Sequence, residues 1–218
     1  MPDGTGQRLL RFDRRLGVRF VAGADEAGRG SLAGPLVVAG VLLDYETLRG
    51  ARVRCLAALN DSKQVAPEER EELFRSVVGC ATAISVRVIP SGEIDRAGLH
   101  RSNLGGLRAV LGDLHPTAEA CLVDGFRLGP TAPPHRAIVD GDTKSAAIAA
   151  ASIVAKVVRD RAMRRLDALY PRYGFASHVG YITPRHSLAV RVHGPCEQHR
   201  RSFNAKAYVP EELLAVAS

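Results

Sequence analysis

Short apolar runs alternate with polar and glycine-rich breaks along most of the chain. Runs of four to eight apolar residues bounded by turn residues are typical of β-strands. We therefore expect strands at residues 18–24, 36–43, 120–123 and 136–139, and the alternating pattern of residues 81–89 predicts a further strand there. Only a short glycine-rich turn joins the first two, so these should pair antiparallel.

Helices are expected between and after these strands. The longest should cover residues 145–169, with an alanine-rich first half that can lie very close to a sheet and a basic second half. The others are expected at 67–78, where Pro67 and the glutamates after it mark a helix start, in a short segment capped by Ser91, at 101–111 despite Gly105-Gly106, and from Thr183-Pro184 to about His193. Residues 1–17 are polar and arginine-rich and are expected to form a short arm or first turn. Strands followed by alternating helix and strand indicate an α/β layer fold with a mixed sheet.

Composition narrows the class of protein. Hydrophobic residues make up 46% of the 218 positions, which fits a globular fold. A formal charge of +7 favours a polyanionic partner, with nucleic acid ahead of a membrane surface. Aromatic residues are only 5%, so duplex binding through the backbone is expected rather than stacking on single strands.

The sequence shows no signal of secretion and no membrane span. The cysteines are far apart and form no Cys-x-x-Cys pair, so neither a zinc site nor a disulfide framework is expected: Cys55, Cys80, Cys121 and Cys196. The N-terminus lacks a signal pattern, and no apolar run reaches the length of a membrane span. A soluble cytoplasmic protein is expected.

Acidic residues stand at the ends of three of the expected strands. Asp25-Glu26 ends the first, Asp124 the fourth and Asp140-Gly141-Asp142 the fifth. If those strand ends lie together, their carboxylates converge, and oxygen ligands of this kind suit Mg²⁺. Two such ions can clamp the attacking and leaving oxygens of a phosphoryl transfer. The pattern therefore indicates metal-dependent phosphodiester chemistry.

Each acidic stretch also has a simpler interpretation. Asp25-Glu26 could be a solvated turn, Asp124-Gly125 a simple turn, and Asp140 or Asp142 an N-cap of the long helix. The Gly28-Arg29-Gly30 turn adds a backbone open to close approach and a guanidinium that matches phosphate. The recurrence of acids at three strand ends favours metal binding.

An ordered set of motifs resembles the ribonuclease HII family. The resemblance runs from about Phe20 to Phe203 and is carried by Asp25-Glu26-Ala27-Gly28-Arg29-Gly30, Asp61-Ser62-Lys63, Val123-Asp124-Gly125, Gly141-Asp142-Thr143-Lys144-Ser145, the segment 149–157, Arg159-Asp160, Gly180-Tyr181-Ile182-Thr183 and His199-Arg200-Arg201-Ser202-Phe203. It implies a ribonuclease H-like mixed sheet flanked by helices, with a small C-terminal helical extension. One domain over 1–218 is expected, with a catalytic core at about 15–170 and the extension at about 171–218.

The same resemblance implies an activity. Members hydrolyse the RNA strand of RNA–DNA hybrids and incise 5′ of single ribonucleotides in duplex DNA, leaving 3′-hydroxyl and 5′-phosphate ends. The implied cofactor is Mg²⁺ or Mn²⁺, with two ions at turnover, and the implied partners are these nucleic acids. A monomer is expected, and the sequence names no protein partner.

Site residues follow from the matching positions. The resemblance makes Asp25, Glu26, Asp124 and Asp142 the metal and catalytic carboxylates. Gly28-Arg29-Gly30 and Tyr181 would sense the ribose 2′-hydroxyl, which distinguishes RNA from DNA. The candidates for phosphate contact are Lys63, Lys144, Lys156, His199 and Arg200, each with a solvated surface charge as the alternative, and Lys156 could instead pair with a carboxylate. Val179 and Ile182 depart from residue types common beside the Gly-Tyr motif.

Two other interpretations of the sequence stay open. One is a nuclease of the same superfold, such as the sister ribonuclease HIII or a resolvase, although the short N-terminal arm argues against HIII. The other is a basic nucleic-acid-binding protein with a dead site. Intact acids at all four metal positions argue against it, because negative charge repels phosphates.

Overall fold

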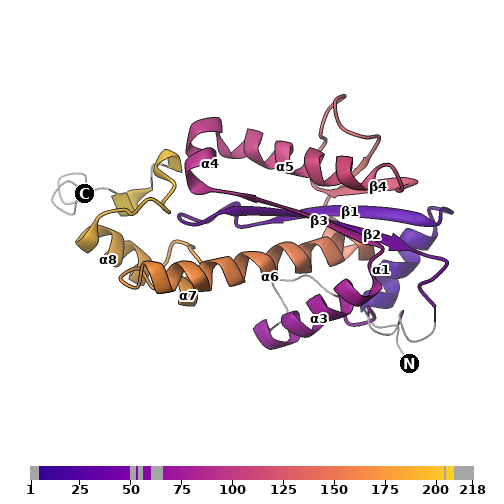
Figure 1. Ribbon diagram of the computed structural model, residues 1–218, viewed down its shortest axis with the longest axis horizontal. Helices are drawn as coiled ribbons and strands as arrows, with labels where there is room; N and C mark the ends of the chain where they lie inside the picture. The colour runs from indigo at the N-terminus through magenta and orange to yellow at the C-terminus, as the bar shows by residue number, and fades with distance from the viewer. Residues whose placement is uncertain (1–4, 50–52, 54–55, 60–65, 204, 209–218) are drawn as a thin grey trace. The chain divides into compact units, whose positions relative to one another are not determined.

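The computed structural model describes residues 5–49, 53, 56–59, 66–203 and 205–208. Its strands are β1 Phe20–Ala27, β2 Leu36–Asp44, β3 Ala83–Ile89, β4 Ala120–Asp124 and β5 Arg136–Ile138 (Figure 1). Its helices are α1 Thr5–Arg14, α3 Pro67–Cys80, α4 Ser91–Ala97, α5 Leu99–Leu114, α6 Ala146–Leu169, α7 Phe175–His178 and α8 Pro184–His193, with 3₁₀ turns η1 Gly141–Thr143, η2 Arg201–Phe203 and η3 Lys206–Tyr208.

Residue contacts divide the chain into two compact units. The sheet unit consists of Met1–Ala27, Val37–Arg87 and Asn103–Val157, and the C-terminal unit consists of Gly28–Leu36, Val88–Ser102 and Val158–Ser218. The expected division into a core at about 15–170 and an extension at about 171–218 stays a prediction.

The sheet is mixed, as expected, and its strands run in the order β3-β2-β1-β4-β5. β1 and β2 pair antiparallel over their whole length, from Phe20 opposite Asp44 to Ala27 opposite Val37, which confirms the predicted pairing. β4 pairs parallel with β1 on one side and with β5 on the other. The carboxyl ends of β1, β4 and β5 therefore point the same way.

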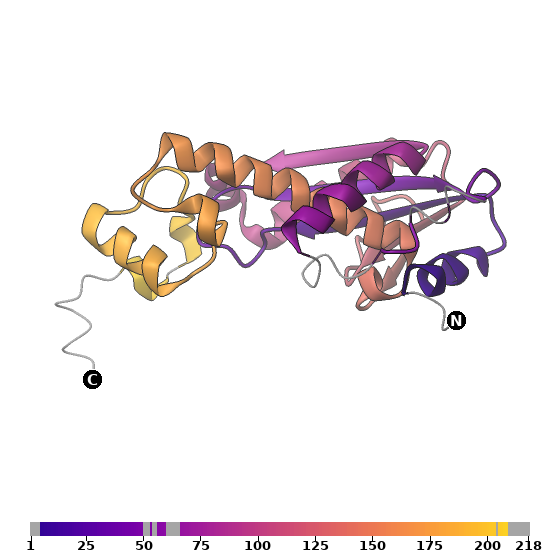
Figure 2. The same cartoon turned by 90° about the horizontal axis from the view of Figure 1, so that it is seen from below.

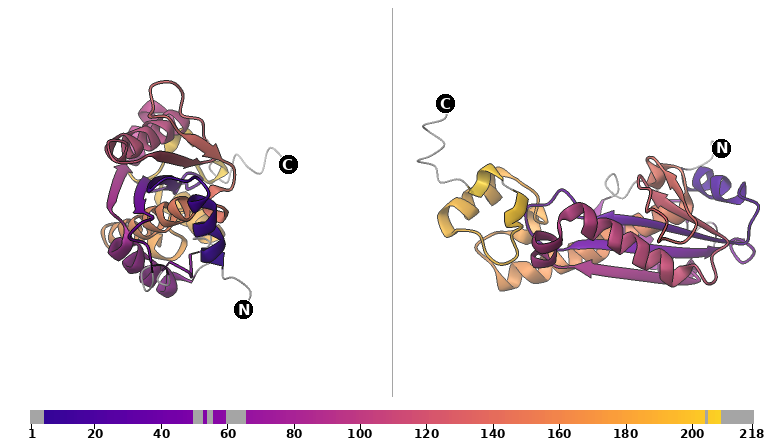
Figure 3. Two further views of the ribbon diagram at one scale, coloured as in Figure 1. Left: turned by 90° about the vertical axis from the view of Figure 1, so that its right-hand side faces the viewer. Right: turned by 90° about the horizontal axis from the view of Figure 1, so that it is seen from above.

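Helices cover both faces of this sheet. α5 lies on one face, and α1, α3 and the first half of α6 lie on the other (Figures 1 and 3). Against α5, a Cβ atom added to Gly40 would lie 2.9 Å from Cδ1 of Leu114. Against α6 the approach is closer still, since a Cβ on Gly23 would lie 2.1 Å from the backbone carbon of Ala147.

The alanine-rich half of α6 makes this approach possible. All six of its alanines are fully buried: Ala146, Ala147, Ala149, Ala150, Ala151 and Ala155. Because a methyl group is small, the helix axis can lie near the strand. A glycine opposite has no side chain at all, so the two backbones can come into contact. The expectation that α6 lies very close to the sheet is confirmed, and Figure 2 shows this helix from its own side of the sheet.

The start of α6 is held by a residue far away in the sequence. Oδ2 of Asp13, on α1, accepts hydrogen bonds from the Ala147 N–H at 2.9 Å and from the Tyr45 hydroxyl at 2.6 Å. The Ser145 Oγ accepts a further bond from Ile148 N–H. Within the segment 1–17, expected to form a short arm or first turn, residues Thr5–Arg14 thus form a ten-residue helix that anchors α6. Asp140, considered as a cap for α6, instead precedes η1 with a φ of 50°.

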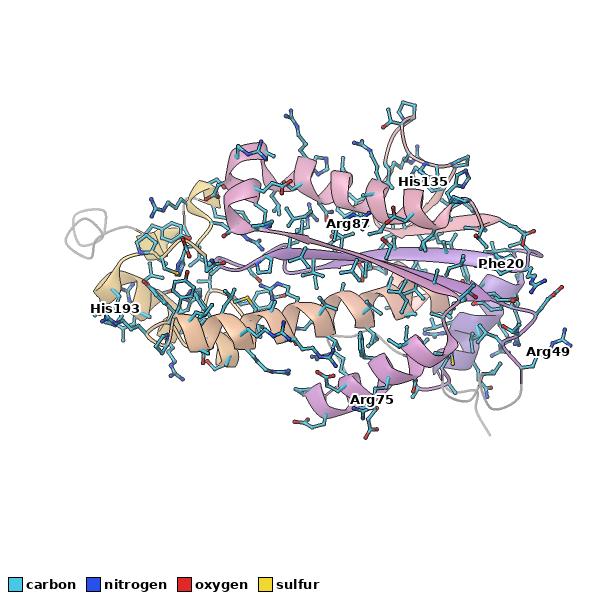
Figure 4. The ribbon with its side chains drawn as sticks, viewed as in Figure 1. Phe20, Arg49, Arg75, Arg87, His135 and His193 are labelled. Atoms are coloured by element: carbon cyan, nitrogen blue, oxygen red, sulfur yellow. The ribbon has the colours of Figure 1, made fainter. Side chains whose placement is uncertain are left out.

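Most of the remaining expectations agree with the structure. Thr183 caps α8 by accepting a bond from His186 N–H at 3.1 Å, as predicted. Gly105-Gly106 does not interrupt α5. The expectation for Ser91 is wrong, because Pro90 precedes α4 and the Ser91 hydroxyl donates to the Glu197 carbonyl. Arg87 of β3 pairs with Asp113 of α5 at 2.6 Å (Figure 4).

The C-terminal unit has a small core of its own. Ala33, Met163, Tyr173, Phe175 and Val190 pack together, and the rings of Tyr173 and Phe175 stack 5.4 Å apart. Among the described residues, no helix is long and apolar enough to cross a membrane.

Gly23→Ala tests the contact between β1 and α6. The added methyl group meets helix backbone rather than a flexible side chain, so we expect the free energy of unfolding to fall by about 1–3 kcal/mol. Gly105→Ala is the matched control, because nothing lies within 4 Å of a Cβ there. In that helix the same substitution should raise stability by up to about 1 kcal/mol. Urea unfolding of both variants measures the difference, and equal effects would contradict the close approach.

Candidate active site

Asp25 and Asp124 stand side by side at the ends of neighbouring strands. Ala24 of β1 pairs with Val123 of β4 in a parallel register. Asp25 and Asp124 are the next residue on each strand, so they are neighbours too. Paired residues of parallel strands point to the same face of a sheet, and Asp25 shares its face with Gly23, which lies against α6. The predicted convergence of these two acids is therefore built into the pairing.

Asp25 is held in a buried and negatively charged environment. Its side chain is 5% exposed, its Oδ1 accepts the Glu26 N–H at 2.7 Å, and Ser152 of α6 hydrogen-bonds to it. Burial raises the pKa of Asp25 well above its ordinary value of 3.8, and the negative charges of Glu26 and Asp124 raise it further. In the absence of a cation, holding Asp25 charged therefore costs free energy.

Asp124 connects the sheet to the turn that carries Asp142. Its Oδ1 accepts the Gly141 N–H at 2.6 Å, and Gly141 and Asp142 belong to η1. A side chain at Gly141 would displace its neighbours, because a Cβ would lie 2.6 Å from Cδ1 of Ile148 and 3.1 Å from Oδ1 of Asp124. Asp142 itself is 6% exposed. One hydrogen bond thus fixes η1 against the end of β4.

The donor set of these acids suits a hard divalent cation. All four side chains offer carboxylate oxygens, the ligand type that Mg²⁺ and Mn²⁺ prefer. Oε2 of Glu26 is buried and accepts no hydrogen bond from the described residues, although Glu26 interacts in other ways. Within the described parts of the chain, no three acidic, histidine or cysteine side chains already form a group that could hold an ion. The assignment of these four acids as metal ligands stays a prediction that the donor chemistry favours.

The Gly28-Arg29-Gly30 turn belongs to the C-terminal unit and is shaped by two buried arginines. Gly28 has a φ of 90°, and a Cβ there would lie 1.8 Å from Nε of Arg159. Arg200 donates from Nη1 to the Arg29 carbonyl at 3.1 Å. In a trans peptide the C=O and the next N–H point in opposite directions. Because the Arg29 carbonyl faces the buried Arg200, the Gly30 N–H faces away from it.

Arg200 and His199 differ from the surface cations expected from sequence. Arg200 is fully buried and also donates to the Gly34 carbonyl, and burial lowers its pKa to about 9, so it keeps its charge at neutral pH. His199 is 2% exposed, and burial beside His186 lowers its pKa to about 4, so it is neutral at pH 7. Direct phosphate contact by either side chain stays untested, and this burial does not favour it.

Tyr181 is an exposed aromatic residue of this unit. Its ring is 40% exposed and lies 5.7 Å from the Arg159 guanidinium, within range of a cation–π interaction. Its backbone carbonyl lies 2.8 Å from Nδ1 of His186, whose Nε2 lies 3.1 Å from Nε2 of His199. The buried histidines therefore support the Tyr181 segment from behind.

The lysines expected to contact phosphate have different settings. Lys63 lies outside the described residues. Lys144 is exposed, and its Nζ donates to the Val139 carbonyl at 2.6 Å. Lys156 is half-buried on α6 and has further interactions.

Sequence reasoning missed the supporting residues. Ser152 and Arg159 lie within the quoted motifs, but nothing in the pattern assigned them to Asp25 or to Gly28. Asp13 gave no signal at all, since its partners Tyr45 and Ala147 are remote in sequence. Contacts of this kind depend on tertiary packing rather than on local pattern.

Comparisons with known proteins agree on one family. The sequence model of the family "Ribonuclease HII" matches residues 22–206. A ribonuclease HII of Acidothermus cellulolyticus is 46% identical over 198 residues, which cover 89% of this chain and 63% of that protein. The chain thus spans a little under two thirds of the length of that relative.

Solved structures give the same fold. The ribonuclease H2 of Pyrococcus horikoshii superimposes with a TM-score of 0.72 at 26% identity, covering 87% of this chain and 95% of that one. The ribonuclease HII of Archaeoglobus fulgidus, solved in a complex with PCNA, gives 0.71 at 26% identity over 86% and 96%. The expected ribonuclease H-like fold is therefore confirmed.

Asp25→Asn tests whether the acidic site is built for a cation. The folded protein raises the pKa of Asp25, so its charge opposes folding increasingly as the pH rises from 3.8 through the raised pKa. The neutral amide avoids this cost. Without divalent ions, the variant should unfold at a higher temperature than the wild type at pH 7, and the gap should close toward pH 3.8.

Added Mn²⁺ or Mg²⁺ should change that comparison, because a ligand of the folded state raises its stability. We expect the ion to raise the unfolding temperature of the wild type more than that of Asp25→Asn. Asp140→Asn is the matched control, since Asp140 is exposed and Asn tolerates its positive φ. Thermal unfolding measures all three proteins, and an equal response to the ion in Asp25→Asn and wild type would contradict metal binding by Asp25.

Proposed function

The chain belongs to the ribonuclease HII family, whose members are divalent-metal-dependent endoribonucleases, and on that premise we propose how it acts. It hydrolyses the RNA strand of RNA–DNA hybrids and incises duplex DNA on the 5′ side of single embedded ribonucleotides, leaving 3′-hydroxyl and 5′-phosphate ends. The observation that carries the proposal is the pair Asp25 and Asp124 on adjacent parallel strand ends, with Asp142 attached through Gly141.

Asp25, Glu26, Asp124 and Asp142 would hold the ions, two at turnover, either Mg²⁺ or Mn²⁺. Bound ions of this kind polarise phosphoryl oxygens and stabilise charge on the attacking and leaving oxygens. The protein orients the carboxylates. Ser152 and the Glu26 N–H fix Asp25, and the Gly141 N–H fixes Asp124. This preorganisation leaves little rearrangement for the reaction itself.

Recognition of the ribose falls to the C-terminal unit. The exposed Gly30 N–H, directed by Arg200, can donate to a 2′-hydroxyl, a bond that deoxyribose cannot accept. The half-exposed Tyr181 ring can pack on a sugar, and Arg159 holds both elements, because it lies under Gly28 and beside Tyr181. Arg29 and Lys144, both exposed, can contact phosphate. His199 and Arg200 act as positioning residues.

Cleavage of a DNA duplex with one ribonucleotide tests the proposed function. We expect a single cut 5′ of the ribonucleotide with Mg²⁺ or Mn²⁺, and no cut with EDTA or in an all-DNA duplex. Asp25→Asn should lower the rate by about 100-fold or more, since a metal ligand supplies several kcal/mol of stabilisation to the transition state. Gel analysis of labelled strands identifies the cut and its end groups. Tight duplex binding without any cut, with either ion, would contradict the proposal and favour a binding protein.

Arg200→Lys tests the positioning role. Lysine keeps the charge but lacks the planar fork, so the Arg29 carbonyl loses its partner and the Gly30 N–H loses its fixed direction. A hydrogen bond to a charged group contributes about 1.5–3 kcal/mol, so kcat/KM on the single-ribonucleotide duplex should fall about 10- to 100-fold.

The rise in unfolding temperature caused by Mn²⁺ should stay the same in Arg200→Lys, because the metal carboxylates are untouched. Arg201→Lys is the matched control, since Arg201 is exposed and adjacent. A purely structural role would lower both the metal response and the activity. Wild-type kcat/KM in a folded Arg200→Lys would show that the fork is not needed.

A further inference from the structure

A basic pocket lies beside the acidic site, within the sheet unit. It has a volume of about 480 Å³ and is lined by Arg8, Arg11, Phe12, Arg15, Thr143 and Lys144. Four of these side chains are cations and none is acidic. A concentration of positive charge in a concave surface attracts anions, because the low-dielectric walls focus the field.

The arginines share one face of α1 and its C-terminal extension. Residues 8, 11 and 15 recur at helical spacing, and all three side chains are exposed. The opposite face carries Leu9 and Leu10, which are buried. Asp13 ties that face to Ala147 and Tyr45. α1 is therefore a fixed platform that presents its arginines outward, not a loose basic arm.

The pocket is adjacent to the acidic site through the chain itself. Thr143 and Lys144 directly follow Asp142, and two trans peptide steps place the Lys144 Cα within about 7.6 Å of the Asp142 Cα. Lys144 uses one of its three N–H donors in a hydrogen bond to the Val139 carbonyl, and the Thr143 hydroxyl donates to the Asp140 carbonyl at 2.8 Å. These bonds hold the two residues at the pocket wall.

We propose that this pocket binds the phosphodiester backbone of the nucleic acid duplex, at phosphates next to the one that is cut. Arginine forks match phosphate oxygens, and a lining with four cations and no carboxylate complements the negative charge of successive phosphates. Backbone phosphates follow each other every ~3.4 Å along the axis of a strand. A phosphate a few positions from the one at Asp142 therefore falls within reach of Lys144 and the arginines.

The inference deepens the proposed function and rests on it. It adds α1, which no motif of the sequence singled out, to the substrate-binding surface, and it makes the contact independent of base sequence. The arginines then act in binding and not in the chemical step, so substituting them should raise KM and leave kcat nearly unchanged.

The test is the salt dependence of duplex binding by Arg8→Ala and Arg15→Ala. A fluorescent all-DNA duplex reports binding by anisotropy without being cut. Each phosphate contact makes the slope of log K against log salt more negative by about 0.9. Each variant should therefore show a slope that is less steep by about that amount, and should bind more weakly at every sequence tested. On the single-ribonucleotide duplex, KM should rise while kcat stays within about twofold of wild type.

Arg75→Ala is the matched control. Arg75 is also an exposed helical arginine, but it projects from α3, and the substitution removes the same charge (Figure 4). Its salt slope should equal that of the wild type. An unchanged slope in both Arg8→Ala and Arg15→Ala, or an equal loss in Arg75→Ala, would overturn the inference.

Failure of the proposed function gives a different result. If the wild type binds duplex through the pocket but never cuts the ribonucleotide strand, the nuclease assignment fails and the pocket assignment stands. If the wild type cuts normally while both pocket variants keep the wild-type slope and KM, the pocket assignment alone fails.

Discussion

The close contact between β1 and α6 is the constraint on which the acidic site depends. Gly23 and Ala147 approach so closely that even one additional methyl group would meet helix backbone. Asp25 lies two residues after Gly23 on the same face of β1, and Ser152 follows Ala147 on α6. The close packing of strand and helix therefore also brings the Ser152 hydroxyl into hydrogen-bonding distance of the Asp25 carboxylate. Core packing and the proposed catalytic site therefore share one set of small residues. A larger side chain at this contact would move Ser152 and α6 together, away from Asp25.

Much of the sheet unit could be predicted from sequence because its signals are local. Apolar runs bounded by turns gave the strands, and the alanine content of residues 146–155 predicted the approach of α6. The acids at strand ends were visible for the same reason. The parallel pairing of β4 with β1 then made neighbours of Asp25 and Asp124. Pairing joins distant segments, but the number of ways in which short strands can pair is small.

Other features depended on burial, which the local pattern does not reveal. The polar, arginine-rich composition of residues 1–17 suggested a short arm or first turn, although Leu9, Leu10 and Asp13 form a buried face of α1. His199 and Arg200 have the residue types of a phosphate site, yet both are buried. Burial makes His199 neutral and directs Arg200 toward backbone carbonyls, so residue type alone suggested a different role. The same limitation hid Asp13, whose partners are only defined by the folded chain.

The arginines show why net charge is a weak guide to function until burial is known. Arg159 and Arg200 contribute to the charge of +7, but both are fully buried and donate to the carbonyls of the segment that follows Gly28. A buried guanidinium is costly unless its donors are satisfied, and five donors in a rigid plane can fix several carbonyls at once. Arg8 and Arg15 are instead exposed and line the pocket, where an external anion can reach them. One residue type thus has two settings in this chain: buried arginines shape the turn proposed to recognise the ribose, and exposed arginines line the pocket proposed to bind the duplex. A substitution that conserves charge should therefore be tolerated on α1 and harmful at Arg200.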